Sequence, residues 1–516
     1  MKKIKIITYS IFALSLLSSC DKEFLTLYPE GNLNEGNFFL STEDFETALV
    51  GAYVPLRDVA SIAYFMDEIR ADNSTYIYNA RDRGNASIEN IETYLNQADN
   101  ATTYARYQAD YNGISRTNII LDNMEDIAFE MSDEDKNRII GEAKALRAFY
   151  YFDLARNYGG VPLHLNQVTT IEETALPRAT LDELYAQILS DLTDAIPLLP
   201  DPIFSGSQTG RMNKGSASTA LAHVYLRLEE YDNAIPLLRD VTQMDYELLP
   251  DFRDIFNPAN KGNQEIIFAV QYQSGNTGQE SNFIYRFTPI TTDTQEILGV
   301  SFNNTIGGWN VPAENLINLF EPGDQRFDAS IGVIEGTDDD QGYIPSGVES
   351  AVGYTPTPGV DYHYFTKKYY YPPYPNLNQN TDQNWPVYRY SEVLLMLAES
   401  LNETGASAEA LTYLNQVRTR AFGSGNGQIT ETDQTNLRGI IAEERRLELV
   451  FENKRYQDLI RTDRAIPVMT EFGEEQKEKF PFLLPQAYNI EKYKLLYPIP
   501  QRELELNPLL VQNPGY

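Results

Sequence analysis

Residues 145–163 read A-L-R-A-F-Y-Y-F-D-L-A-R-N-Y-G-G-V-P-L, and this stretch predicts the end of a long helix. Its paired glycines stop the helix, and the proline that follows keeps it from resuming. Upstream, Ser132 followed three residues later by Asp135 has the form of an N-terminal cap. Apolar residues at helical spacing lie between the two ends: Ile139, Ala143, Leu146 and Tyr150. We therefore expect a helix over residues 132–158 with one face in a core.

Helical spacing recurs on both sides of this segment. Further helices are expected at residues 41–58, 101–124, 180–199, 214–228, 231–243, 388–404, 408–422 and 435–451. Three segments look like copies of one unit, with small residues in paired helices: 143–199, 217–238 and 394–417. Small residues let two helices approach closely, as they do in tetratricopeptide repeats. The sequence thus predicts a mainly α fold, a tetratricopeptide-like scaffold of helical hairpins over about 41–250 and 385–516.

The segment between the two helical regions has a different texture. Residues 251–384 are rich in glycine, asparagine, proline and threonine, and they contain one short apolar run at 266–272. The run 362–374 is packed with aromatic residues, which we assign to a small sheet. We predict a loop-rich insertion with small β elements, laid against the scaffold within a single domain over 20–516. Residues 67–100 are polar and are expected to be loop with short helical pieces.

The N-terminus is typical of an export signal. A basic start is followed by an apolar stretch that is too short to span a bilayer, and residues 1–19 end in Leu-Ser-Ser before Cys20. Cys20 is the only cysteine in the chain, so an internal disulfide is excluded. We predict that Cys20 carries a lipid anchor after cleavage. The alternative is an ordinary secretory signal with an incidental cysteine.

The net charge of the chain excludes some classes of binding partner. A formal net charge of −33 repels nucleic acid and anionic membrane surfaces. The same charge disfavours a strongly anionic polysaccharide as ligand, unless a local basic cluster or a bridging cation intervenes. Tyrosine is common, with 35 copies against 2 tryptophans, so aromatic surface is available for a neutral ligand.

Residue patterns that carry enzyme chemistry are missing from the sequence. The three histidines, His164, His223 and His363, lie far apart and outside any metal-ligand spacing. No nucleophile elbow, P-loop or dinucleotide fingerprint is present. The acidic run 338–340 has the oxygen ligands that calcium prefers, but a solvated acidic turn is the simpler interpretation. We therefore predict a protein that is not an enzyme, with no cofactor and no metal site.

A binder of neutral sugars needs aromatic faces bordered by amides and charged groups. Trp309 lies in N-N-T-I-G-G-W-N, residues 303–310, which we interpret as a flexible polar loop. A large ring between glycines and asparagines either packs or binds, and both readings stay open. If Trp309 binds, its replacement by alanine should abolish sugar binding without lowering the melting temperature. Trp385 directly precedes a scaffold block and is expected in the core.

The block at 145–163 and six others resemble the SusD/RagB family of outer-membrane nutrient-binding lipoproteins. The other blocks are R-A-T-L-D-E-L-Y-A-Q-I-L-S-D-L (178–192), G-R-M-N-K-G-S-A (210–217), Y-R-Y-S-E-V-L-L-M-L-A-E-S-L-N-E (388–403), L-N-Q-V-R-T-R-A (414–421), E-E-R-R-L-E-L-V-F-E-N-K-R-Y-Q-D-L-I-R (443–461) and the closing stretch 496–516. Asn453 stands where the family usually has glycine. These blocks are mostly structural, and we expect Arg147, Arg445 and Arg446 to form ion pairs inside the scaffold.

The resemblance implies a location, a partner and a site. Residues 21–23, directly after the cysteine, are charged. In lipoproteins of this family, such a run goes with export to the outer face of the outer membrane. The implied partner is a SusC-type TonB-dependent transporter. The family's sugar site takes residues from the insertion and from the polar loop after the first helix, which here are Trp309, Tyr76, Tyr78 and Arg81, with Tyr285 as a weaker candidate.

Three functions are compatible with these observations. The first is capture of a neutral oligosaccharide or polysaccharide for delivery to the transporter. The second is capture of oligopeptides, as in the RagB branch of the family. The third is a tetratricopeptide scaffold that binds only protein.

Overall fold

The structure is a computed structural model of the 516-residue chain. It describes residues 38–76, 86–125, 127–206, 208–338, 342–423 and 426–516. The predicted signal segment and Cys20 lie outside the described residues, as do Tyr78 and Arg81.

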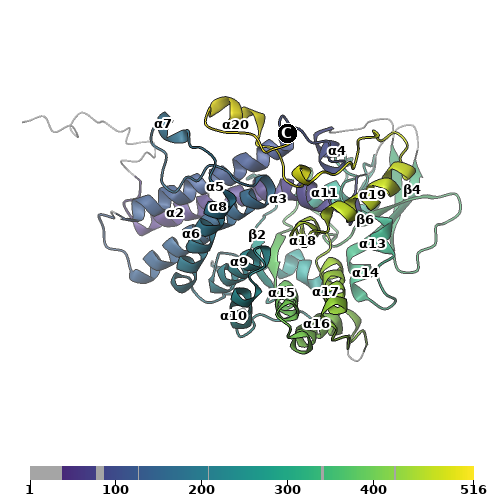
Figure 1. The fold of residues 1–516 in the computed structure, drawn as a ribbon. Coiled ribbons are helices and arrows are strands. Elements are labelled where there is room, and N and C mark those ends of the chain that lie inside the picture. The colour runs from purple at the N-terminus through teal and green to yellow at the C-terminus, as the bar shows by residue number, and fades with distance from the viewer. Residues whose placement is uncertain (1–37, 77–85, 126, 207, 339–341, 424–425) are drawn as a thin grey trace, which may run out of the picture.

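Helices α2 (Thr42–Tyr53), α5 (Ala101–Glu125), α6 (Asp133–Tyr158) and α8 (Leu181–Ala195) form one end of the molecule, and the shorter α3 (Pro55–Ala63) lies nearer its middle (Figure 1). The helix predicted over 132–158 is confirmed as α6. The hydroxyl of Ser132 accepts a hydrogen bond from the N–H of Asp135 at 3.1 Å, and Gly159 ends the helix with φ 76°. At the start of α8, Thr180 and Glu183 form a reciprocal capping box.

The prediction of one helix over residues 41–58 is wrong. The structure has two helices there, because α2 ends at Tyr53 and α3 begins at Pro55. Proline has no N–H to donate to the preceding turn, so it starts a helix more readily than it continues one. The second helix runs further than expected and passes into a short π-helix, η2 (Tyr64–Glu68).

The predicted helical hairpins are confirmed. Helix α9 (Lys214–Arg227) packs on α10 (Tyr231–Val241), and α15 (Tyr390–Glu403) packs on α16 (Ser407–Phe422). Because α10 also packs on α15, the two hairpins stack as repeat units do. Helix α17 (Gln434–Glu448) covers α15, and three further helices follow that the sequence did not predict: α18 (Arg455–Arg461), α19 (Ala465–Lys479) and α20 (Gln501–Leu506).

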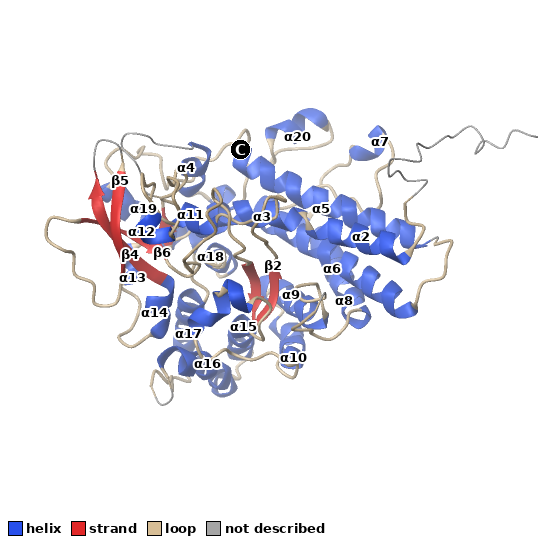
Figure 2. Ribbon diagram, turned by 180° about the vertical axis from the view of Figure 1, so that it is seen from behind, coloured by secondary structure: helices blue, strands red, loops and turns tan. Residues whose placement is uncertain are grey.

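The strands lie mainly at the other end of the molecule (Figure 2). Strand β4 (Ile331–Asp338) runs antiparallel between β5 (Tyr343–Ser350) and β6 (Asp361–Thr366). Two smaller pairs join distant parts of the chain: β1 (Ser74–Thr75) with β3 (Val311–Pro312), and β2 (Ile266–Val270) with β7 (Trp385–Arg389). Short helices fill the rest: α4 (Ala86–Glu92), α7 (Ile171–Thr174), α11 (Phe283–Phe287), α12 (Gln295–Leu298), α13 (Glu314–Ile317) and α14 (Gln325–Ser330).

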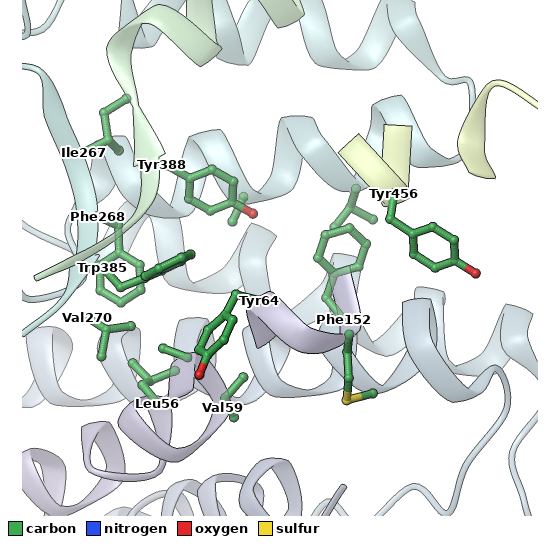
Figure 3. Packing of buried hydrophobic residues seen from close by; sticks show 14 of the residues in the cluster. Leu56, Val59, Tyr64, Phe152, Ile267, Phe268, Val270, Trp385, Tyr388 and Tyr456 are labelled. Carbon is green, nitrogen blue, oxygen red and sulfur yellow. The ribbon is translucent and has the colours of Figure 1, made fainter. Parts of the chain in front are cut away.

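The β2–β7 pair carries the centre of the core (Figure 3). Trp385, predicted to be in the core, is 3% exposed and stacks on Tyr369 with ring centroids 5.1 Å apart. Its ring also contacts Phe283 and Tyr64. Of the aromatic run 362–374, β6 takes only the first part, whereas Tyr369 and its neighbours pack in the core.

The ion pairs predicted for three arginines are confirmed. Arg147 binds both carboxylate oxygens of Asp191, Arg445 contacts Asp458, and Arg446 contacts Asp72. Arg147 and Asp191 are both buried, and in the other two pairs one partner is buried and the other is at most 16% exposed, so the pairs fix the scaffold. The described residues contain no group of three or more histidine, cysteine, aspartate or glutamate side chains placed to hold a metal ion. None of the helices in the described ranges is both long and apolar enough to cross a membrane.

Candidate functional site

Two segments that the sequence analysis assigned to one site meet in the structure. Strand β1 pairs with β3, with Ser74 opposite Pro312 and Thr75 opposite Val311. The N–H of Ala313 extends this pairing by donating to the carbonyl oxygen of Asn73 at 2.9 Å. The pairing therefore places the residue after β1 beside the loop before β3.

That arrangement stacks Tyr76 on Trp309. Their ring centroids are 4.3 Å apart, with 17° between the ring planes. Phe65 meets the tryptophan edge-on, at 5.2 Å and 85°. Trp309 is 8% exposed and Tyr76 is 5% exposed, so most of both rings is covered. We call Phe65, Tyr76 and Trp309 the aromatic cluster.

The loop that carries Trp309 is held in place, so the expectation of a flexible loop is wrong. Asn304 is buried, and its amide nitrogen donates to the carbonyl oxygens of Tyr285 and Pro289 at 2.7 and 3.0 Å. The N–H of Trp309 donates to the carbonyl oxygen of Arg286 at 2.9 Å. At Gly307 a Cβ atom would lie 2.1 Å from a backbone oxygen, so only glycine fits there.

Two polar residues at the aromatic cluster were missed by the sequence analysis. The guanidinium carbon of Arg286 lies 5.6 Å from the Phe65 ring centroid, and its Nε donates to the side chain of Asn282. Asn310 is fully buried with φ 52°, and neither atom of its side-chain amide has a partner among the described residues. Arg286 follows Tyr285 and Asn310 follows Trp309, two residues that the sequence analysis predicted for the site. Proximity to a predicted site residue was the only feature of the sequence that could have indicated them.

Arg286 also acts on a buried phenol beneath the cluster. Tyr64 contacts the Phe65 ring at 4.2 Å and is itself fully buried. Burial raises the pKa of the Tyr64 hydroxyl well above its ordinary value, while the positive charge of Arg286 acts in the opposite direction. The contacts that orient the Arg286 side chain are the hydrogen bond from its Nε to Asn282 and its approach to the Phe65 ring.

Tyr285, the other predicted site residue that the structure describes, does not join the aromatic cluster. Tyr285 is fully buried in a second apolar cluster, where its ring contacts Phe302 and Tyr374. Burial raises the pKa of the Tyr285 hydroxyl to about 12, and this hydroxyl has no partner among the described residues. Its covered ring offers no face to a ligand in this conformation. Tyr78 and Arg81 lie outside the described residues and stay predictions.

The cluster combines aromatic rings with a guanidinium, and these are the two kinds of group that a sugar binder uses. Trp309 is 8% exposed and Tyr76 is 5% exposed, so in this conformation the C–H face of a pyranose could cover only a small part of each ring. Covering a few tens of Å² of ring contributes about 1 kcal/mol at about 25 cal/mol per Å². Binding at such a site is weak unless several contacts combine.

Comparisons with known proteins place the chain in a family. The profile described as "SusD family" matches residues 264–516. The profile described as "Starch-binding associating with outer membrane" matches residues 23–226. A SusD-like protein of Formosa agariphila is 29% identical over 540 residues, covering 100% of both chains. A SusD-like protein of Bacteroides ovatus is 24% identical and is covered over 98% of its length.

Solved structures share the fold over nearly the whole chain. A structure described as a laminarin-binding SusD-like protein superposes with a TM-score of 0.73 at 26% identity, covering 92% of this chain and 99% of that one. The surface glycan-binding protein A of Bacteroides thetaiotaomicron, solved with laminarihexaose, gives a TM-score of 0.71 at 22% identity, covering 91% and 99%. With the two profiles matching both halves of the chain, this protein belongs to the SusD family.

Proposed function

We propose that this chain is a cell-surface lipoprotein that captures a neutral oligosaccharide through the aromatic cluster. The observation that carries the proposal is the β1–β3 pairing, which stacks Tyr76 on Trp309 and sets Arg286 beside the same cluster. The laminarin-binding relative shares the fold at 26% identity and supports a glycan as the ligand. The heavy negative charge of the chain favours a neutral glycan over an acidic one.

The captured glycan would be passed to a SusC-type TonB-dependent transporter, with no bond broken by this protein. Weak binding suits that role, because a carrier must release its cargo. A lipid on Cys20 would hold the protein on the outer face of the outer membrane. Replacing Cys20 by serine in cells should release the protein from the membrane fraction, and retention there would contradict the anchor.

The test of glycan capture is calorimetry on the purified mature chain. Titrations with hexasaccharides of β-1,3-glucan, α-1,4-glucan, β-1,4-xylan and β-1,4-mannan are run beside a peptide digest. We expect heat from at least one neutral glycan, with affinity in about the micromolar to millimolar range. Heat from the peptides alone would favour oligopeptide capture, and no heat from either would favour a scaffold that binds only protein.

A pair of matched variants locates the site. Trp309→Phe and Trp385→Phe both shorten a buried tryptophan, but only the first lies in the aromatic cluster. We expect Trp309→Phe to weaken glycan binding several-fold, with Trp385→Phe unchanged. Equal affinities for the two variants would remove the aromatic cluster from the site.

A further inference from the structure

One pocket of the molecule is lined by arginine side chains, although the chain carries a formal net charge of −33. It has a volume of about 410 Å³ and lies between helix α17, the start of α18 and the turn before α19. Among the described residues that line it, the charged ones are Arg446, Arg455, Arg464 and Glu443. We call it the arginine pocket. It shares no lining residue with the aromatic cluster, and its volume lies in the range of small-molecule sites.

Two of the arginines are anchored to the segment before β1. Arg455 binds both carboxylate oxygens of Asp72, from Nε at 2.8 Å and from Nη2 at 3.0 Å. Arg446 donates from Nε to the side-chain oxygen of Asn73 at 2.8 Å and from Nη2 to the carbonyl oxygen of Asp72 at 2.9 Å. In both guanidinium groups the third nitrogen, Nη1, makes no hydrogen bond with a described residue. The side chains of Arg446 and Arg455 are 11% and 8% exposed, so each is held in place while part of it stays accessible.

The third arginine stands at the rim of the pocket. Arg464 is exposed, and its guanidinium makes no hydrogen bond or ion pair with any residue in the described ranges. Leu319 and Ile440, both half-buried, add aliphatic surface, and Asn436 adds an exposed amide. Apolar surface beside a few convergent polar groups is typical of sites for small molecules.

The positive charge of the arginine pocket is only partly neutralised. Arg446 and Arg455 share the carboxylate of Asp72. Burial lowers the pKa of Arg446 to about 10, and the charge of Arg455 acts in the same direction, whereas Asp72 opposes both. In the adjoining cleft the other arginines each pair with a carboxylate: Arg438 with Glu403, Arg445 with Asp458 and Arg461 with Glu399. The arginine pocket therefore has guanidinium charge that an anionic ligand can balance.

We propose that the arginine pocket binds an oxyanion, either a carboxylate or a sulfate ester, that is carried by a sugar unit. Guanidinium groups recognise such oxyanions through charge-assisted hydrogen bonds, often two at a time. The aliphatic surface of Leu319 and Ile440 can cover C–H groups of the same sugar ring. The pocket is thus the local basic cluster that lets a strongly acidic chain accept a charged glycan. Taking a sugar as the carrier rests on the proposed function, whereas the site and the anion do not.

The pocket is tested by removing charges of opposite sign from two exposed residues. Arg464→Gln removes a positive charge, and Glu443→Gln removes a negative one. Neither side chain makes a hydrogen bond or ion pair with a described residue, so the melting temperature should stay unchanged. The matched control is Arg502→Gln, which removes an exposed arginine in α20, at the opposite edge of the molecule from α17 (Figure 1).

Calorimetry on the mature chain uses probes that differ in their anion and its carrier. The charged sugars are the α-1,4-linked trisaccharide of galacturonic acid and galactose 6-sulfate, and the α-1,4-linked trisaccharide of galactose is the neutral control. Inorganic sulfate tests a free oxyanion, and tri-glutamate tests a peptide. Each titration is run at about 20 mM and about 200 mM NaCl, because salt screens charge pairing at an accessible site.

We expect at least one charged sugar to bind more tightly than the neutral trisaccharide, and to bind more weakly at the higher salt concentration. Arg464→Gln should weaken this binding about tenfold and Glu443→Gln should tighten it about threefold, with Arg502→Gln unchanged. If the charged sugars bind no better than the neutral one, or if all four proteins bind them equally, the pocket is not an anion site.

The other probes decide what carries the anion. Inorganic sulfate that binds as tightly as the charged sugars would overturn the sugar as the carrier, and tighter binding of tri-glutamate would assign the pocket to peptides. These outcomes leave the capture of a neutral glycan by the aromatic cluster standing, because Trp309→Phe tests that site separately. Conversely, loss of neutral binding alone would refute the proposed function and leave the arginine pocket in place.

Discussion

Trp309 is a residue for which the sequence left two interpretations open. Its position between glycines and asparagines predicted a ring that packs or binds, and the structure shows that it packs on Tyr76 and Phe65. The pairing that decides this involves only two residues per strand, which is too short to leave a periodic signal. The same limit applies to Asn310, because its burial and the lack of a partner for its amide among the residues that the structure describes can be seen only in three dimensions.

The burial of Trp309 changes the expected effect of removing it. Since its ring is 8% exposed, Trp309→Ala should lower the free energy of unfolding by about 3 kcal/mol, as large-to-small core changes do. This replaces the expectation from sequence that the melting temperature would stay unchanged. Urea unfolding followed by far-UV circular dichroism measures the loss. Thr412→Ala, at an exposed site, is the control, and equal stabilities for the two variants would show that the ring is not buried.

At the scale of elements, caps and breakers predicted several helix ends correctly, although Pro55 was not recognised as the start of α3. Ser132, Thr180 and Gly159 stand at the ends where sequence placed them. Elements without such marks were missed. Helices α18 and α19 have no side-chain cap at their first turn. In the three-stranded sheet, β4 pairs with the next strand, β5, and also with β6 beyond the loop over residues 351–360, and no local signal marks that second pairing.

The contact between α5 and α6 gives a prediction about one glycine. Gly113 lies where α5 packs on α6, and a Cβ atom there would sit 2.2 Å from the ring of Tyr150. Gly113→Ala should therefore destabilise the protein by about 1–3 kcal/mol, even though alanine is the better helix former. Thermal unfolding of the two proteins measures this.

A second helical glycine provides the matched control. Gly439 in α17 is exposed, and a Cβ atom there would meet nothing within 4 Å. Gly439→Ala should raise stability by up to about 1 kcal/mol, because only the backbone preference changes. If both substitutions shifted the melting temperature in the same direction, the close approach of α5 and α6 would not be the cause.

At the scale of the whole molecule, the family blocks predicted the scaffold but not how its charges are arranged. Arg326, Arg389 and Arg420 are buried together with the carboxylates of Glu265, Glu444 and Glu448. These residues come from distant segments, so sequence spacing could not connect them. Removing one member of such a network leaves a buried charge without a partner, which strongly destabilises the fold. These residues of the sequence blocks therefore serve structure rather than ligand binding.

This arrangement predicts how stability depends on pH, and Asp458 is the clearest case. Burial would raise the pKa of Asp458, but Arg445 and Arg461, at 3.2 and 2.7 Å, outweigh burial and hold the pKa well below its ordinary value. The pKa of an aspartate in the unfolded chain is about 3.9. A carboxyl whose pKa is lower than this in the folded protein stabilises the fold at pH values above about 3.9, and this stabilisation is lost as the pH falls further. Asp458→Asn should cost about 3–5 kcal/mol at pH 7, because it leaves buried arginines without their partner.

The difference between wild type and Asp458→Asn should narrow as the solution is acidified. Between pH 7 and pH 3 the wild type alone loses the contribution of this carboxylate, so the gap in unfolding free energy should shrink by about 1 kcal/mol. Urea titrations of both proteins at pH 7, 5, 4 and 3 measure this difference in unfolding free energy. The two proteins share every other titratable group, so the contributions of those groups cancel in the difference. Glu403→Gln is the control, since Glu403 pairs with Arg438, whose side chain is 48% exposed, and should cost no more than about 1 kcal/mol at any of these pH values. A gap that stays constant or widens in acid would mean that Asp458 is not held in its charged form by the two arginines.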